Sequence, residues 1–217
     1  MYKLVKRLSR GVLIVFEGID GTGKSTQIKR IKEFLMNKEF QVTTSFEPNP
    51  DNKWGELIKK KIRTTRDVSP KQELEWYIND RKWDLDHNIK PSLKEKHVVI
   101  IDRYYMSNAA YQGALDQFDL EYILEKNSFA TTPDLWIIFD LSVEIAQSRI
   151  QTRKFNNTDA LEKASYQKKV RQNYELLTKM DIGGEIRWID ASKPVDIITE
   201  ELKLIIMDLL EKYIIKE

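Results

Sequence analysis

The sequence predicts an α/β fold, a doubly wound five-stranded parallel sheet flanked by helices, and three observations support this prediction. Five short apolar runs alternate with segments of helical periodicity. Most of these runs are continuously apolar, which is typical of strands buried on both faces of a parallel sheet. The polar motifs come directly after the runs, where the carboxyl ends of parallel strands bind ligands.

The predicted elements follow one another in strand–helix alternation. Strands are predicted at residues 12–16, 42–46, 98–101, 135–139 and 186–189. Helices are predicted at residues 25–37, 69–96, 119–126, 142–154, 161–180 and 195–213. In the first helix, Ile28, Ile31 and Leu35 lie on one apolar stripe. Ser69 followed by Pro70 is a helix start signal.

The composition limits the class of protein. Hydrophobic residues make up 41% of the chain, and the net charge of +2 gives no electrostatic reason to expect nucleic acid binding. The absence of cysteine excludes disulfides and thiolate chemistry, and His87 and His97 lack the spacing of metal ligands. No apolar run has the length of a membrane span, and residues 1–10 lack an apolar signal-peptide core. We therefore expect one cytoplasmic domain over residues 1–217 that binds neither nucleic acid nor membrane.

The segment GIDGTGKS at residues 18–25 is a complete G-x-x-x-x-G-K-S motif between a predicted strand and a predicted helix. Its glycines let backbone N–H groups turn inward around phosphates, and the helix N-terminus adds positive charge. Lys24 is expected to reach the β- and γ-phosphates, and the Ser25 hydroxyl to bind Mg²⁺. The motif predicts nucleoside triphosphate binding, which kinases share with switches and motors. The predicted ATP contacts are Gly18, Gly21, Thr22, Gly23, Lys24, Ser25 and Thr26.

Asp102 and Arg103 follow the third predicted strand and narrow the function. In this architecture Asp102 lies beside the phosphate-binding motif, so it is predicted to hold Mg²⁺ together with Ser25. Arg103 presents a planar fork to phosphate oxygens, which suits an enzyme that brings two anionic substrates together. A surface ion pair is the alternative interpretation of Arg103.

The stretch RKFNNTD at residues 153–159 is polar and basic between two predicted helices. It predicts a small lid at about residues 150–163, and an ordinary surface loop is the alternative.

Two longer stretches contain the motifs described above, FEGIDGTGKST at residues 16–26 and DRYYMSNAAYQG at residues 102–113. Together with several shorter stretches they resemble the thymidylate kinase family over nearly the whole chain. Shorter matches follow in the right order at residues 47–48 (EP), 77–81 (YINDR), 89–91 (IKP), 133–135 (PDL) and 189–191 (IDA). The resemblance implies a P-loop nucleotide kinase that is typically a homodimer and that transfers a phosphoryl group from MgATP to dTMP.

The resemblance also implies individual roles. Arg149 would lie against the adenine of ATP. Asp20 would meet the 3′-hydroxyl of dTMP, and Arg103 would hold its phosphate. Tyr77 would stack on thymine, and Arg81, on the same helix face at i+4, would read the base. The other implied residues of the dTMP site are Pro48, Ser107, Asn108, Tyr111 and Gln112.

Plain structural alternatives remain open for some of these residues. Tyr77 could be a core aromatic like its neighbour Trp76. Asp80 and Arg81 could form a solvated charge pair, and Asp20 could be a simple turn residue.

The chain departs from the family pattern in two places. Gly21 and Ala160 stand where relatives carry a catalytic arginine, in the phosphate-binding motif or in the lid, so we assign that role to Arg153. The arginine that relatives carry next to Glu47-Pro48 is also absent, and Lys53, Lys59 or Arg63 are its candidate substitutes.

The predicted reaction is phosphoryl transfer from ATP to dTMP, with Lys24, Asp102, Arg103 and Arg153 as catalytic residues. The first alternative is another deoxynucleotide or deoxynucleoside kinase, for which Glu17 or Asp102 would be the base. A P-loop ATPase switch is the second alternative.

Overall fold

The computed structural model describes residues 6–62, 68–151 and 164–215 and contains a five-stranded, all-parallel sheet. The strand order is β2-β3-β1-β4-β5. The strands are β1 (Val12–Glu17), β2 (Val42–Phe46), β3 (Val98–Asp102), β4 (Leu135–Asp140) and β5 (Glu185–Asp190). The predicted fold class is confirmed, and every predicted strand is present with ends that differ by no more than one residue.

The helices flank this sheet. They are α1 (Lys24–Asn37), α2 (Lys53–Leu57), α3 (Pro70–Asp84), α4 (Lys90–Lys94), α5 (Tyr105–Gly113), α6 (Leu120–Lys126), α7 (Val143–Gln151), α8 (Ala164–Leu177) and α9 (Val195–Glu211). Two π-helical segments, η1 (Ile58–Ile62) and η2 (Leu85–Ile89), continue α2 and join α3 to α4. The helix predicted at residues 69–96 is therefore a chain of three segments, which Ser69 caps by accepting a hydrogen bond from the Gln72 N–H.

The sequence did not predict α2, η1 or α5. The predicted helices at residues 142–154 and 161–180 both extend into residues 152–163, which lie outside the described ranges. Within those ranges, no helix has the length and apolar character needed to cross a membrane.

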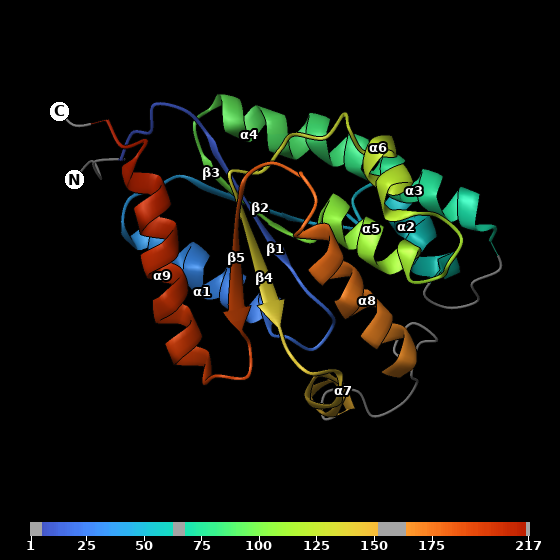
Figure 1. Ribbon diagram of the computed structural model, residues 1–217. Helices are drawn as coiled ribbons and strands as arrows, with labels where there is room; N and C mark the ends of the chain where they lie inside the picture. Colours follow the sequence, from blue (N-terminus) through green and yellow to red (C-terminus); the bar gives the residue numbers. More distant parts are fainter. Residues whose placement is uncertain (1–5, 63–67, 152–163, 216–217) are drawn as a thin grey trace.

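The helices form a layer on each face of the sheet (Figure 1). α1 and α9 cover one face, and α3, α4, α5, α6 and α8 lie on the other. From β1 the chain runs to β2 and β3 on one side, and later to β4 and β5 on the opposite side. The strand order thus reverses at β1, and the carboxyl end of β1 is the point where such sheets bind ligands.

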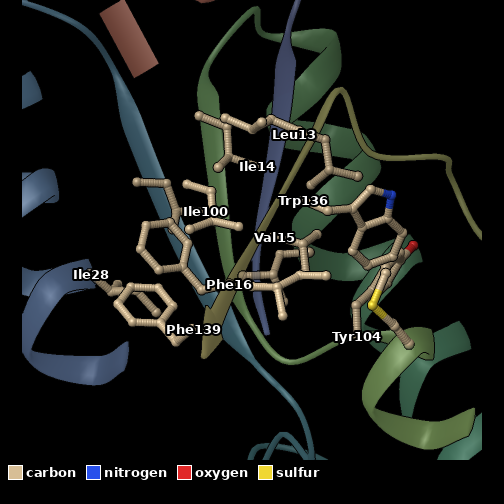
Figure 2. Close-up of a cluster of buried hydrophobic side chains, with 14 of the residues drawn as sticks. Leu13, Ile14, Val15, Phe16, Ile28, Ile100, Tyr104, Trp136 and Phe139 are labelled. Atoms are coloured by element: carbon tan, nitrogen blue, oxygen red, sulfur yellow. The ribbon is translucent and has the colours of Figure 1, made fainter. Parts of the chain in front are cut away.

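The core holds β1 in place from both sides (Figure 2). Phe16 stacks on Phe139 of β4 with ring centroids 5.6 Å apart, on the side where Ile28 of α1 lies. On the other side Trp136 lies 6.2 Å from Tyr104, centroid to centroid. Because β1 is buried along its whole length, the loop that follows it starts from a rigid support.

Candidate active site

The phosphate-binding loop, residues 18–25, leaves β1 in a conformation that requires glycine. Gly21 has φ 84°, and a Cβ added there would lie 2.4 Å from the Ala146 carbonyl oxygen of α7. Any side chain at this position would therefore collide with α7 as well as strain the backbone. This contact and the positive φ favour glycine at position 21.

Lys24 lies inside the phosphate-binding loop. Its Nζ donates hydrogen bonds to the carbonyl oxygens of Gly18 at 2.9 Å and Ile19 at 3.0 Å. Two causes lower the pKa of Lys24 to about 8: burial is the larger, and the positive charge of Arg103 is the second. The ammonium is therefore held where the motif places the phosphates, in a site that favours the arrival of negative charge.

Ser25, in the first turn of α1, contacts Asp102 at the end of β3. The Ser25 hydroxyl donates to Asp102 Oδ2 at 2.8 Å. Asp102 Oδ1 is buried and has no hydrogen-bond partner among the residues that the structure describes. A hydroxyl beside a carboxylate with an unused oxygen fits Mg²⁺, which binds through one or two protein oxygens and completes its shell with water and phosphate. The described ranges hold no cluster of three or more His, Cys, Asp or Glu side chains suited to a metal.

Arg103 is held by three side chains. Its guanidinium donates to Asp20 Oδ1 at 2.6 Å, to the Ser107 hydroxyl at 3.1 Å and to the Tyr111 hydroxyl at 3.0 Å. Burial alone would lower the pKa of Arg103, but Tyr111 and Asp20 hold it well above its ordinary value. Only 15% of the Arg103 side chain is exposed, whereas its ion-pair partner Asp20 is 47% exposed, so the pair lies at the edge of the surface.

Arg81 and Glu47 form a buried ion pair. Arg81 Nε donates to Glu47 Oε1 at 3.0 Å, and its NH2 group contacts Glu47 Oε2. The side chains are 1% and 3% exposed, so the alternative of a solvated charge pair at Asp80 and Arg81 is wrong. Burial raises the pKa of Glu47, and Arg81 opposes this rise. Removing one partner of such a pair destabilises the protein, because the other partner is left as a buried charge without its counter-charge.

The loop after β2 is attached to α3 by carboxylates. The Asn49 N–H donates to both Asp80 oxygens at 3.1 Å, and Asn52 Nδ2 donates to Asp80 Oδ1 at 2.8 Å. One turn further along α3, Asp84 accepts from the Ser45 hydroxyl at 2.7 Å. These bonds hold the segment that contains Pro48 beside Arg81.

The helix α5 supplies the other predicted residues of the dTMP site. Asn108 Oδ1 accepts from Arg81 NH1 at 3.3 Å, and Asn108 Nδ2 donates to Gln112. Asn127, at the end of α6, bonds both Arg81 and Asn108. Arg81, Asn108 and Gln112 thus belong to one buried hydrogen-bonded chain, and their role in binding dTMP stays a prediction.

A cavity of about 260 Å³ joins the loops after β1, β2 and β3. Its lining residues are Asp20, Gly21, Gly23, Lys24, Ser25, Thr26, Phe46, Glu47, Asp102 and Arg103. Phe46 and Glu47 are the lining residues that the sequence did not assign. Phe46 ends β2 and Glu47 directly follows it, and this position at the carboxyl end of a strand was the available signal. The predicted site residues outside this lining are Gly18, Thr22, Pro48, Tyr77, Arg81, Ser107, Asn108, Tyr111, Gln112 and Arg149.

Tyr77 and Arg149, which lie outside this lining, each contact another part of the protein. Tyr77 is half-buried and packs beside Ile58 and Trp76, so its described packing is that of a core aromatic. Arg149 NH1 donates to the Ala191 carbonyl oxygen at 3.0 Å and so joins α7 to the loop after β5. The roles of Tyr77 on thymine and of Arg149 on adenine stay predictions.

Some of the residues predicted to supply a cation lie outside the described ranges. Arg153 and Ala160 lie outside the described residues, as does Arg63. Lys53 has its Nζ 4.5 Å from the centre of the Trp54 ring.

Comparison of the sequence with known proteins identifies its family. A profile described as thymidylate kinase matches residues 16–202. A thymidylate kinase of Desulfotalea psychrophila is 38% identical over 93% of this chain and 96% of the relative. Probable thymidylate kinases of Archaeoglobus fulgidus and Thermococcus kodakarensis are 39% and 36% identical, each over 92% of this chain and over 96% and 98% of the relative. The chain belongs to the thymidylate kinase family.

Proposed function

We propose that this protein transfers the γ-phosphoryl group of ATP to dTMP, giving ADP and dTDP. The observation that carries the proposal is the pairing of Arg103 with Asp20, which places a held cation beside the phosphate-binding loop. An enzyme that joins two anions needs such a cation between them, whereas a switch that hydrolyses ATP does not.

The residues divide the work between the two substrates. The phosphate-binding loop and Lys24 would hold the phosphates of ATP, and Arg103 would hold the phosphate of dTMP opposite them. An oxygen of dTMP phosphate forms the new bond to the γ-phosphorus while the bond to the bridging oxygen of ADP breaks. That oxygen is already a nucleophile at neutral pH, so the protein contributes position and charge rather than a strong base.

Ser25 and Asp102 would hold Mg²⁺, which supplies charge neutralisation between the phosphates when bound. Their geometry and the unused Asp102 Oδ1 support this assignment.

The remaining assignments complete the proposal. Tyr77 and Arg81 would recognise thymine, and Pro48, Ser107, Asn108, Tyr111 and Gln112 would shape the rest of the dTMP site. Arg149 would face adenine, and Arg153, in the predicted lid at residues 150–163, would supply the catalytic arginine. We also propose a cytoplasmic homodimer, as the family resemblance implies.

The deoxynucleoside kinase alternative is not favoured. It needs a carboxylate that can take a proton from a 5′-hydroxyl, and Glu17 was one candidate. Glu17 is fully buried, accepts hydrogen bonds from four protein donors and does not line the cavity. The other candidate, Asp102, bonds Ser25 at the expected Mg²⁺ position.

The test is ADP formation from MgATP with dTMP, dUMP, dCMP, thymidine or no acceptor. We expect dTMP to give the highest kcat/KM. Preference for thymidine would support the nucleoside kinase, and acceptor-independent ADP formation would support the switch.

A further inference from the structure

Glu17 is a buried carboxylate at the end of β1 to which the proposed reaction gives no role. Oε1 accepts from the N–H groups of Tyr104 at 2.9 Å and Ser107 at 3.1 Å. Oε2 accepts from the Tyr174 hydroxyl at 2.9 Å and from the Ser107 hydroxyl. These bonds tie the strand that precedes the phosphate-binding loop to α5 and α8.

The two N–H groups lie at the start of α5, which needs a partner for them. Helix N-termini leave their first N–H groups without partners inside the helix, and Tyr104, the capping residue of α5, makes no side-chain cap bond. Glu17 supplies the acceptor from another part of the chain, and its negative charge suits the positive end of the helix. The start of α5 is therefore set by the residue directly before Gly18.

Two of the three side chains that hold Arg103 belong to this helix. Ser107 accepts from Arg103 NH1 at 3.1 Å, and Tyr111, one turn later, accepts from Arg103 NH2 at 3.0 Å. The third, Asp20, lies in the phosphate-binding loop just after Glu17. A shift of α5 relative to β1 would therefore move Arg103 away from the position that Asp20 and the loop define.

Tyr174 holds the carboxylate from the other side. Its hydroxyl lies 2.7 Å from the Ser107 hydroxyl and 2.9 Å from Glu17 Oε2, and the residue is 1% exposed. The Tyr174 hydroxyl therefore contacts both the Glu17 carboxylate and the Ser107 hydroxyl, which in turn accepts from Arg103.

We propose that Glu17 is a positioning residue for the acceptor phosphate: it fixes the start of α5 and so aims Arg103, and Tyr174 supports it. This inference rests on the proposed function. Glu17 acts through Ser107 and α5 and does not itself touch substrate.

The test compares three variants in the full-length protein. Tyr174→Phe removes one donor to Glu17 while keeping the ring, and Glu17→Gln keeps the shape but removes the charge. Asn173→Ala is the matched control, because Asn173 Nδ2 donates to the Ala110 carbonyl oxygen and thus joins the same two helices without touching Glu17.

We expect Glu17→Gln to raise the KM for dTMP about tenfold or more, and Tyr174→Phe to raise it about threefold, since each weakens a charge-assisted hydrogen bond. The KM for ATP should stay within about twofold, because the contacts of Lys24 are unchanged. Asn173→Ala should leave both constants near those of the wild type.

The readout separates positioning from general damage. If Tyr174→Phe leaves the KM for dTMP unchanged, or raises both KM values alike, the proposal is overturned. An effect of Asn173→Ala equal to that of Tyr174→Phe would also overturn it, because the cause would then be helix packing. The wild-type rate with dTMP reports separately on the proposed function, so the two failures are distinguishable.

Discussion

Arg103 at the end of β3 and Asp20 in the phosphate-binding loop form an ion pair, with 2.6 Å between Arg103 NH2 and Asp20 Oδ1. The two residues are 83 positions apart, and the parallel pairing of β1 with β3 brings them together. The pair joins the expected donor half of the site to the acceptor half. Its guanidinium is further held by Ser107 and Tyr111, so the cation has a defined direction.

Arg103→Ala should abolish the use of dTMP while leaving ATP binding nearly unchanged. We expect kcat/KM for dTMP to fall by about a thousandfold or more, as when an arginine that stabilises the negative charge of a phosphoryl-transfer transition state is removed. The dissociation constant of ATP should change less than about threefold. Arg30→Ala is the control, because Arg30 pairs with Asp196 on α9 away from the cavity. Turnover within a few-fold of the wild type would show that the assigned role is wrong.

Lys24 predicts a pH dependence for ATP binding. Burial lowers its pKa to about 8, and the charged form that binds phosphate is present below that pH and lost above it. Therefore kcat/KM for ATP, which reports on the free enzyme, should fall about tenfold per pH unit above pH 8. Bound triphosphate would raise the pKa, so kcat should stay level to higher pH. Steady-state pH profiles check this, and a kcat/KM that stays flat to about pH 9.5 would contradict it.

The Glu47–Arg81 pair predicts an asymmetry in stability. Glu47→Leu leaves a buried arginine without its counter-charge and should lower the free energy of unfolding by about 3–5 kcal/mol. Adding Arg81→Met removes the remaining charge and should restore most of that loss, without restoring turnover of dTMP. Urea unfolding of both variants measures this. A double variant no more stable than the single one would mean that the pair does not behave as a buried ion pair.

The proposed metal site predicts a change in Mg²⁺ requirement. Chelation with excess EDTA should stop phosphoryl transfer, and Asp102→Asn should raise the Mg²⁺ concentration for half-maximal rate about tenfold or more. Asp140→Asn is the control, since Asp140 ends β4, on the other side of β1 from β3, and pairs with Arg171. If Asp102→Asn keeps the wild-type Mg²⁺ dependence, Asp102 is not at the metal.

Most of the strands were predictable because strands buried on both faces have continuous apolar runs, as in Val98–Ile101. The helix α5 was not, because its start is capped by Glu17, which lies 87 residues before Tyr104 in the sequence. No local signal can report a cap that another part of the chain supplies. The helix α2 did carry a local signal, since the Asn52 side chain accepts from the N–H groups of Trp54 at 2.8 Å and Gly55 at 3.1 Å.

In the site, too, residues in local motifs could be predicted from the sequence, and contacts between distant parts of the chain could not. Lys24, Ser25, Asp102 and Arg103 lie in motifs whose chemistry is local, and the structure brings all four to one cavity. Glu47 as the partner of Arg81 could not be predicted, because their pairing depends on how α3 packs behind β2. The catalytic role of Arg153 and the lid at residues 150–163 stay predictions.

The proposed phosphoryl transfer is tested most directly by following the γ-phosphoryl group of ATP itself. With ATP labelled at the γ-phosphate and dTMP as acceptor, we predict that the label enters the β-phosphate of dTDP and that little inorganic phosphate forms. Label that appears as inorganic phosphate, or that is transferred to thymidine in preference to dTMP, would contradict the central claim.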